Sequence, residues 1–393
     1  MVDFWGEEQE PKKINKKKLV IVIALAILLI VLIILDLIYS KNKDFREWTD
    51  KYIFRKEISA ENTISIDISE DENINAFAFN NNLVLLRKKK LELYDKLGAK
   101  EIEFEIDINN PIFSSESKYL AIAEDEGEKI YLIKDKKLLW ENKIEGKISQ
   151  IEVNKKGFVS VVVTNTSYKS VIYMYDLYGK ELFKTYLATA RVVDINISEN
   201  GEYLAIAEID TTGILVQSII KIVSIKNAQE NPENSFISTY NAEPGRIISN
   251  IEYQGNSKIV CVYDDSIDVL EQEKNEQIYN LIKGDITFYS NELEHNVIKV
   301  EEKQSGEYSA DSYVTIKNIL NNKEKQYITE QVAKEVYTCK NIIALNLGTE
   351  LHIINTNGWL IKKYLSEKEI NEIVVSQNII GIVQRDKINI INL

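Results

Sequence analysis

The chain has 393 residues, of which 45% are apolar and 28% charged, and its 61 acidic residues outnumber its 48 basic ones to give a net charge of −13. This apolar content excludes an intrinsically disordered chain. Two Cys and two His exclude a disulfide scaffold and a multi-ligand zinc module, so we predict no metal site and no cofactor. The acidic balance argues against nucleic acid as a partner, because nucleic-acid binding needs a basic surface.

The first feature along the chain is a long apolar segment. Residues 19–35 read LVIVIALAILLIVLIIL, and three further apolar residues follow Asp36. About 20 helical residues cross a hydrocarbon core of about 30 Å, so we predict a transmembrane helix over 19–39. The main alternative is a cleaved signal peptide, whose apolar region is shorter and ends in a small-residue cleavage pattern that DLIYSKNKDF lacks. We interpret the segment as an uncleaved signal anchor.

The flanks of this segment predict its orientation in the cell membrane. Five Lys precede it and four basic residues follow within a similar distance, which is a small bias toward a cytoplasmic N-terminus. A long C-terminal domain crosses the membrane largely regardless of its charge. We therefore predict a single-pass protein with a cytoplasmic tail at 1–18, a juxtamembrane linker at 40–56 and an extracytoplasmic domain at 57–393.

Three aromatic residues follow the predicted span. Phe45, Trp48 and Tyr52 are spaced at i, i+3 and i+7, which places them on one face of a helix. Trp and Tyr are typical of the membrane–water interface. We interpret the three as an interfacial anchor, with an ordinary polar linker as the alternative.

Beyond residue 57 the sequence repeats. The string YLAIAE occurs at Tyr119–Glu124 and again at Tyr203–Glu208, 84 residues further on, and each copy follows an apolar strand end and a turn. Weaker copies bring the number of such strands to eight. Each is followed by a third strand and mostly by a fourth, at intervals of 35 to 49 residues. Four short strands repeated about every 40 residues predict the blades of a β-propeller.

The two ends of this region predict how the ring closes. The last unit stops at Leu393 on its third strand, and the strand-like run TISIDIS at 63–69 precedes the first complete unit. Pairing the two would complete a composite blade and remove a sheet edge. The sequence therefore predicts an all-β propeller of eight four-stranded blades closed by an N-terminal strand, with seven blades as the alternative.

The repeat units resemble known propeller families. FSSESKYLAIA and ISENGEYLAIA resemble the S-x-x-G-K-Y-L-A element of WD40-like and TolB-like propellers, and YDLYGKELFK and KDKKLLWENK resemble the blade ending of quinoprotein, or PQQ-like, propellers. The whole chain is similar to membrane-anchored PQQ-like propellers of unknown function from Gram-positive-type bacteria. Quinone-cofactor enzymes of this group need a vicinal Cys pair, whereas Cys261 and Cys339 are 78 residues apart. The resemblance therefore implies the fold and no cofactor.

No catalytic motif stands out in the repeats. His295 and His352 fall in different predicted blades, and we interpret both as structural or surface residues. We predict a non-enzymatic binding or scaffold module. The alternative is a quinoprotein-like or hydrolase-type enzyme that uses carboxylates in the central channel. The channel lining discriminates between the two, because several buried carboxylates with shifted pKa values would favour an enzyme or a metal site.

The strand connections predict two differently charged faces. In a propeller the connections between second and third strands lie on one face, and the turns between third and fourth strands lie on the other, which here carries many Lys. Because the N-terminal strand enters from the Lys-bearing face, we expect that face to point toward the membrane. We expect the acidic face to meet a protein or cell-envelope partner. The candidate residues of this acidic face are Glu124, Asp125, Glu126, Glu208, Asp210, Asp264, Asp265, Glu301, Glu302, Glu307 and Asp311.

Overall fold

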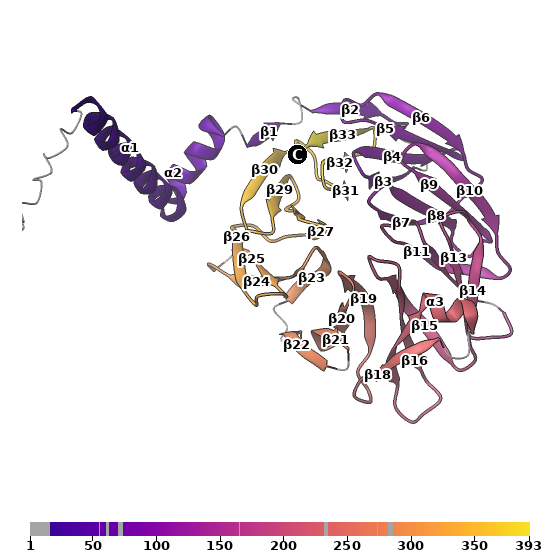
Figure 1. Cartoon of the computed structure of the whole chain (residues 1–393). Helices are drawn as coiled ribbons and strands as arrows, with labels where there is room; N and C mark the ends of the chain where they lie inside the picture. Colours follow the sequence, from indigo (N-terminus) through magenta and orange to yellow (C-terminus); the bar gives the residue numbers. More distant parts are fainter. Residues whose placement is uncertain are drawn as a thin grey trace, which may run out of the picture. The chain divides into compact units, whose positions relative to one another are not determined.

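The computed structural model describes residues 16–54, 56–59, 63–69, 74–164, 166–231, 235–272, 274–281, 286–307 and 309–393, so most of the predicted cytoplasmic tail lies outside the described residues. Contacts divide the chain into two units, Met1–Glu57 and Ile58–Leu393. The first unit is helical and the second is built of β-sheets (Figure 1). Each unit is taken by itself below.

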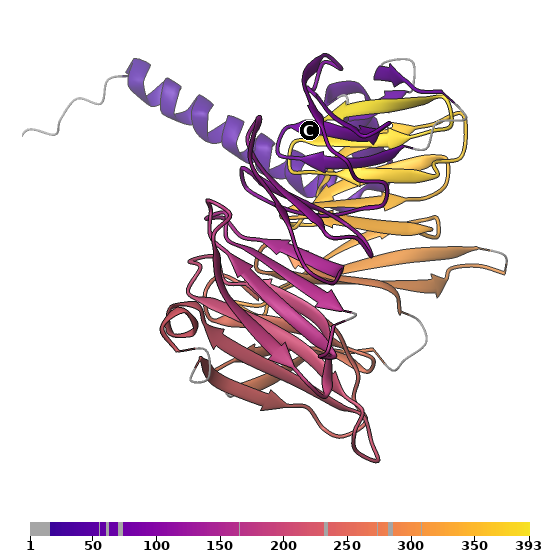
Figure 2. The ribbon, with the colours of Figure 1, turned by 90° about the vertical axis from the view of Figure 1, so that its right-hand side faces the viewer.

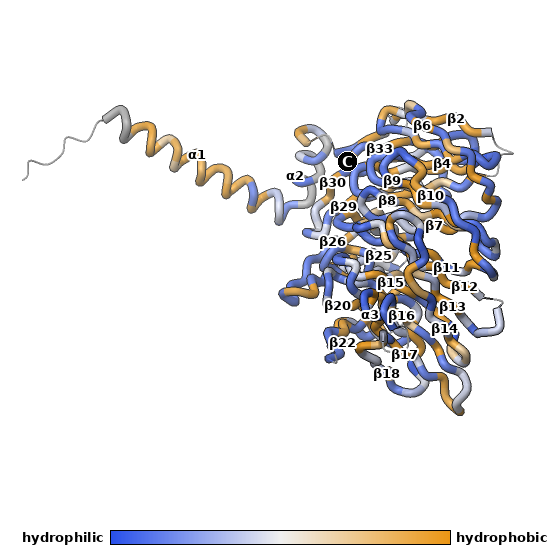
Figure 3. The backbone as a smooth tube through the Cα atoms, turned by 45° about the vertical axis from the view of Figure 1, so that its right-hand side comes forward, coloured by the Kyte–Doolittle hydropathy of each residue, from blue (hydrophilic) through white to orange (hydrophobic). Residues whose placement is uncertain are grey.

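The first unit begins with the apolar helix α1 (Lys16–Lys41). Its side chains from Val20 to Leu37 are exposed, and the tube in Figure 3 is apolar along almost the whole helix. An isolated helix without a polar face has no way to bury its apolar surface in water. Its length and composition over Val20–Lys41 suit a membrane span, and the helix of a signal sequence has the same two properties.

Two short helical segments follow α1. Asn42 caps α2 (Lys43–Trp48), accepting a hydrogen bond from the backbone N–H of Phe45, and the π-turn η1 (Thr49–Ile53) continues it. The predicted aromatic face is confirmed. The ring centroids of Phe45 and Trp48 lie 6.2 Å apart, as do those of Trp48 and Tyr52.

The second unit contains eight sheets within its described residues, arranged in a ring (Figure 1). The first four blades, with strands in order from the inside of the ring outward, are β3 (Asn75–Phe79), β4 (Asn82–Arg87), β5 (Lys90–Tyr94) and β6 (Lys100–Glu105); β7 (Pro111–Glu116), β8 (Tyr119–Glu124), β9 (Lys129–Lys134) and β10 (Lys137–Lys143); β11 (Lys147–Val153), β12 (Val159–Thr164), β13 (Ser170–Tyr175) and β14 (Glu181–Leu187); and β15 (Ala190–Ile197), β16 (Tyr203–Asp210), β17 (Gln217–Ser224) and β18 (Phe236–Asn241).

The remaining four blades complete the ring. They are β19 (Ile248–Gln254), β20 (Lys258–Tyr263), β21 (Ser266–Glu271) and β22 (Lys274–Asn280); β23 (Ile286–Leu293), β24 (Asn296–Gln304), β25 (Ala310–Asn318) and β26 (Glu324–Thr329); β27 (Glu335–Cys339), β28 (Ile342–Asn346), β29 (Glu350–Asn355) and β30 (Leu360–Leu365); and β31 (Glu372–Val375), β32 (Ile379–Val383), β33 (Lys387–Asn392) and β2 (Ile64–Asp67). Every pairing whose register the structure gives within these blades is antiparallel.

The eighth blade joins the two ends of the propeller. Strand β2 pairs antiparallel with β33, with Ile64 opposite Ile390 and Asp67 opposite Lys387. This confirms the predicted composite blade and the count of eight. Two details differ from the prediction. Strand β1 (Glu57–Ser59) adds a fifth strand beside β30, and the short helix α3 (Ile225–Glu230) fills the connection between β17 and β18 where no helix was expected.

The repeated string YLAIAE is explained by its position as the second strand of blades 2 and 4, buried on both faces. In β8, Leu120 and Ile122 pack with residues of blade 1, whereas Ala121 and Ala123 pack with residues of blade 3. The second copy, in β16, does the same with blades 3 and 5. After the initial Tyr, which also packs toward the following blade, the large side chains therefore face the preceding blade and the two Ala face the following one, which allows tight packing of one blade on the next.

The connections sort into two faces of the ring. The hairpin face carries the second-to-third strand connections, including 125–128, 211–216, 264–265 and 305–309. The turn face carries the third-to-fourth strand turns at 95–99, 135–136, 176–180, 319–323 and 356–359. Strands β24 and β25 are nine residues each, and their orange hairpin reaches past its neighbours in Figure 2. Because β2 runs antiparallel to β33, β2 begins at the turn face, after β1 has joined blade 7.

Candidate functional site

The inner strands of five consecutive blades bring carboxylates to the central channel. Each lies in the second half of its strand, toward the turn face, and the five are Glu116, Glu152, Asp194, Glu252 and Glu292. Four of the strands share a β-bulge at the same level, after Ile148, Val192, Ile248 and Ile286. A bulge re-aims the side chains that follow it, so these strands present polar residues where a regular strand would alternate.

Amide and hydroxyl groups connect the carboxylates from blade to blade. Ser114 Oγ on β7 donates to Glu152 Oε2 on β11 over 2.9 Å. Asn196 Nδ2 on β15 lies 2.8 Å from Glu252 Oε2 on β19 and 3.4 Å from Glu152 Oε1. We call this row of inner-strand residues the channel seam. It ties blades 2 to 5 together through side chains in addition to the apolar packing between sheets.

A second row of the channel seam lies two residues earlier along β15 and β19. Asp194 Oδ2 accepts two hydrogen bonds of 2.8 Å, one from Asn250 Nδ2 and one from the backbone N–H of Ile251. Its Oδ1 accepts a hydrogen bond of 3.0 Å from the backbone N–H of Ile195. Asn291 Nδ2 then donates to Asn250 Oδ1 over 2.5 Å. Each carboxylate of blades 3 to 5 is therefore held by defined donors on a neighbouring inner strand.

Burial raises the pKa values of these carboxylates. It raises the pKa of Glu152 to about 8, with added repulsion from Asp194, and the pKa of Asp194 to about 7. The pKa of Glu252 is raised well above its usual range, first by burial and then by the charge of Glu152. A carboxyl surrounded by protein and facing other carboxylates resists ionisation, because the charged form loses hydration and is repelled by its neighbours.

The channel seam ends in a contact across the ring. Lys340 Nζ, in the turn after β27, lies 2.6 Å from Glu116 Oε1 on β7, although blades 7 and 2 are not neighbours. Glu292 accepts a hydrogen bond of 3.1 Å from Thr338 Oγ1. Its pKa is raised by the protein around it, but its side chain is exposed, so water in the channel limits that rise.

The channel lining therefore bears on the choice between binding module and enzyme. Several carboxylates with raised pKa values do line the channel, as the enzyme alternative requires. Their hydrogen bonds run to neighbouring strands, which suits a structural seam. Among the described residues, no group of three or more His, Cys, Asp or Glu is arranged to hold a metal ion.

All but one of the predicted acidic residues lie on or beside the hairpin-face connections. Four of them are exposed, namely Glu126, Asp264, Glu302 and Glu307. Others are half-buried and already engaged: Asp265 pairs with Arg246 over 2.8 Å, and Glu301 pairs with Lys299 over 3.0 Å.

One of these residues does not belong to the face. The sequence placed Glu208 in a loop, but β16 extends to Asp210, so Glu208 lies inside the sheet, is 1% exposed and pairs with Lys221 on β17. Glu208 is therefore unavailable to a partner.

The remaining candidate groups are held within the fold. His352 lies 2.9 Å from Tyr327 Oη and 3.2 Å from Glu350 Oε2, and burial lowers its pKa to about 4, so it is neutral at physiological pH. Cys261 and Cys339 are both free thiols. Burial raises the pKa of Cys339 to about 11, which leaves it a poor nucleophile.

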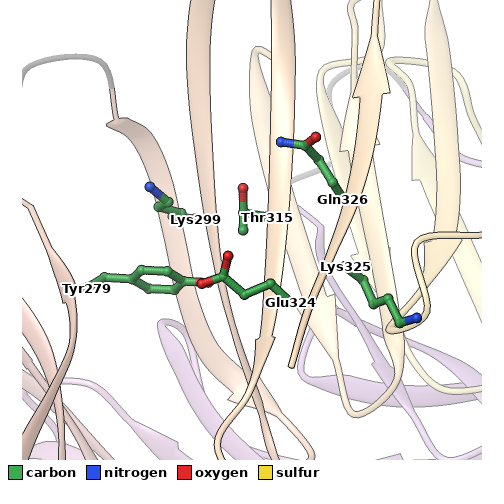
Figure 4. Close-up of a pocket in the computed structure, with 6 residues that line it drawn as sticks. All are labelled: Tyr279, Lys299, Thr315, Glu324, Lys325 and Gln326. Carbon is green, nitrogen blue, oxygen red and sulfur yellow. The ribbon is translucent and has the colours of Figure 1, made fainter. Parts of the chain in front are cut away.

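A cavity of about 350 Å³ lies between blades 5 and 6 (Figure 4). The cross-strand row Lys299, Thr315 and Gln326 forms one wall, and Tyr279 on β22 faces it. Lys299 lies 5.3 Å from the centroid of the Tyr279 ring. Its charge is offset by Glu301, so the cavity has no strong net preference for an anion or a cation.

Comparison with known proteins decides the family. The model of a family of unknown function, DUF5711, matches residues 54–393, which include the whole propeller. The chain belongs to the DUF5711 family. No curated protein matches the sequence.

Solved structures similar to this DUF5711 chain include a WD40 domain. The C-terminal WD40 domain of Sif2 is 11% identical with a TM-score of 0.54, over 84% of this chain and 99% of that one. BamB from Moraxella catarrhalis is 11% identical with a TM-score of 0.47, over 84% and 98%, and AztD from Citrobacter koseri is 9% identical with a TM-score of 0.48, over 76% and 87%. At 11% identity the likeness to the Sif2 domain shows the fold alone, and it confirms the WD40-like part of the resemblance.

The channel seam of the DUF5711 chain was missed by reading the sequence, although a signal exists. The string ISQIEV at 148–153 recurs as ISNIEY at 248–253, and VDINIS at 193–198 has the same alternation of apolar and polar residues. An alignment of the inner strands with each other places Gln150, Asp194 and Asn250 at equivalent positions. The same alignment places Glu152, Asn196 and Glu252 at equivalent positions two residues further on.

The cavity gives a first testable prediction. Tyr279 is buried, and its hydroxyl has no hydrogen-bond partner among the described residues. Tyr279→Phe removes an unsatisfied polar group, so we expect the free energy of unfolding to stay unchanged or rise by about 1 kcal/mol. Tyr364→Phe is the matched control, because the Tyr364 hydroxyl accepts a 3.0 Å hydrogen bond from Asn389 and its loss should cost about 1 kcal/mol. Urea unfolding compares the two, and an equal loss in both would contradict the prediction.

Proposed function

We propose that this protein is a single-pass membrane protein whose extracytoplasmic propeller binds a protein or cell-envelope partner through its hairpin face, without catalysing a reaction. The apolar length of α1 supports the anchor. The slight excess of Lys before α1 and the long domain after it support the orientation. A rigid ring with connections of unequal length suits recognition, because binding residues are commonly carried on loops held by a scaffold.

The observation that carries the proposal is the tip of the β16–β17 hairpin. Residues 211–216 form this tip, where Ile214 is fully exposed and Leu215 is 59% exposed. Asp210 fixes its base by accepting hydrogen bonds from the backbone N–H and the hydroxyl of Thr212. Two adjacent apolar side chains held in solvent on a hairpin tip are unfavourable in the free protein, and they become favourable when a partner covers them.

The surroundings indicate the chemistry of the partner. Exposed carboxylates at Glu126, Asp264, Glu302 and Glu307 lie on other connections of the same face. A partner that presents a small apolar pocket within a basic surface would complement both features. Charges of this kind at the rim steer association and select the partner, while the apolar pair supplies most of the affinity.

Photocrosslinking at the hairpin tip tests the proposal. A benzophenone side chain at position 214 of the full chain, in intact cells, should give a covalent adduct with another protein or with a cell-envelope polymer. The same group at position 237 is the matched control, because Ile237 is also an exposed Ile of blade 4 but lies on the outer strand β18. No adduct from position 214, or the same adduct from both positions, would contradict the proposal.

The channel carboxylates support a second candidate function, that of an enzyme that uses them as proton donors and acceptors. The raised pKa values of Glu152 and Asp194 fall near neutrality, where a carboxyl can both give and take a proton. The hydrogen bonds of the channel seam oppose this function, because a group that cross-links blades is not free to face a substrate.

A further inference from the structure

Four turns on the turn face present a large apolar side chain to solvent. Leu97, Tyr178, Leu320 and Trp359 are 65%, 83%, 56% and 69% exposed, and they belong to blades 1, 3, 6 and 7. Each lies in the turn between the third and fourth strands, so all four project from the same face of the ring. They are spread around that face, one to a blade.

The four turns are built in the same way. In each, an Asp or Asn beside the end of the third strand accepts two hydrogen bonds from backbone N–H groups of the turn. Asp95 accepts from Leu97 and Ala99, both at 2.8 Å, and Asp176 accepts from Tyr178 and Lys180 at 2.8 and 2.9 Å. Side-chain acceptors of this kind fix the turn conformation. The exposed apolar residue is therefore held outward before any ligand arrives.

The turns of blades 6 and 7 show the same arrangement with Asn. Asn318 accepts from the N–H groups of Leu320 and Asn321 at 3.1 and 3.2 Å, and Asn355 accepts from Asn357 and Trp359 at 3.0 and 3.1 Å. A single exposed apolar side chain would need no explanation, but the same turn with an exposed apolar residue occurs here four times.

Lysines accompany these apolar tips. Lys96 precedes Leu97, Lys180 follows Tyr178 by two residues, and Lys323 follows Leu320 by three. All three are exposed, and none forms an ion pair with the described residues. Their ammonium groups are available to anions in front of the turn face.

We infer that the turn face docks on the surface of an anionic lipid bilayer, with Leu97, Tyr178, Leu320 and Trp359 inserted at the headgroup boundary and the neighbouring Lys on lipid phosphates. Trp and Tyr prefer the membrane interface, Leu adds buried apolar area, and each Lys is attracted to the anionic surface. The inference rests on the proposed membrane attachment of α1, and β2, which closes the ring, begins at this face.

A bilayer fits this arrangement better than a protein partner does. A protein interface concentrates its apolar anchors in one central patch. Here each anchor lies on a separate blade. Blade 3 is a neighbour of neither blade 1 nor blade 6. A flat, laterally continuous surface can accept all four at once. The hairpin face, with its exposed carboxylates, would be repelled by the same lipids.

Fluorescence quenching by brominated lipids tests the inference with the full chain. Three variants each keep one Trp and replace the other native Trp residues by Phe: one keeps Trp359, one keeps Trp48, and one carries Ile214→Trp alone. Each is reconstituted in vesicles of phosphatidylcholine with brominated acyl chains and about 30% phosphatidylglycerol, and in vesicles without the anionic lipid. Brominated chains quench only a fluorophore that reaches the bilayer.

We expect quenching of Trp359 to be at least about twofold that of the Trp at position 214, and to fall when phosphatidylglycerol is omitted or when Lys96, Lys180 and Lys323 are changed to Gln. Trp48 follows the predicted span directly and reports insertion of the anchor. Quenching of Trp48 without quenching of Trp359 would overturn docking while the membrane attachment stands. If neither residue is quenched, the membrane attachment itself fails, and docking fails with it.

Discussion

Replacing both Glu152 and Glu252 by Gln should stabilise the propeller at alkaline pH and leave it unchanged in acid. Burial raises the pKa of Glu152 to about 8 and that of Glu252 well above its usual range. In the unfolded chain a Glu has a pKa of about 4.3, so the folded state binds more protons between the two values. Stability must therefore fall as the pH rises from about 4 through about 8, because ionisation costs more in the fold than in the unfolded chain.

Gln keeps an oxygen for the hydroxyl of Ser114 and carries no charge at any pH. We expect the double variant to gain about 2 kcal/mol over the native chain at about pH 8, and almost nothing at about pH 3, where both Glu side chains are protonated in the fold and in the unfolded chain. Urea unfolding of the full chain at the two pH values measures this. The matched control replaces two exposed residues, Glu105 and Glu367, by Gln. The same pH dependence in the native chain and the channel variant would contradict the account of the channel seam.

Placing a charge on the closing strand should have a larger effect. Ile66 on β2 is 7% exposed and packs with Leu83, Val374 and Ile388, which belong to blades 1 and 8. Ile66→Asp removes apolar burial and places a carboxylate in this cluster, so we expect a loss of about 4 kcal/mol. Because β2 completes blade 8, opening it also exposes the edge of β33, and we expect aggregation of the variant.

The neighbouring residue provides the control for this experiment. Ser65 lies on the same strand, opposite Asn389, but its side chain is exposed. Ser65→Asp introduces the same carboxylate without burial and should cost less than about 0.5 kcal/mol. Chemical denaturation of the two variants separates burial from charge. Equal stability of both would show that β2 does not hold the ring closed.

The closure could be predicted because it depends on counting. The last repeat unit has three strands and ends at Leu393, so it lacks an outer strand, and the extra strand predicted at 63–69 can supply it. The two identical YLAIAE strings give the length of the repeat. The position of Glu208 could not be predicted in the same way. Strand ends are set by the partner strand, and β16 continues to Asp210 because β17 pairs with it as far as Gln217. Sequence alone placed the loop too early.

The candidate site was less accessible to sequence than the fold was. The channel seam joins residues 38 to 57 positions apart on different blades, so no local pattern brings them together. In a single strand such as ISQIEV, the polar residues suggest a solvent-exposed side, whereas the ring turns that side toward other strands of the same kind. The exposed residues Leu97 and Trp359 were likewise inconspicuous, since a single apolar residue in a turn carries no signal until the fold aligns four turns on one face.

The central claim is that the propeller lies outside the cytoplasm with its hairpin face accessible, and one labelling experiment tests it most directly. Ile214→Cys places a thiol on the exposed tip, in a background where the partly buried Cys339 is changed to Ser and Cys261 stays buried. Intact cells are treated with a membrane-impermeant maleimide, and an equal sample is treated after lysis. The account predicts the same labelling in both samples. Labelling that appears only after lysis would place the propeller in the cytoplasm and contradict the account.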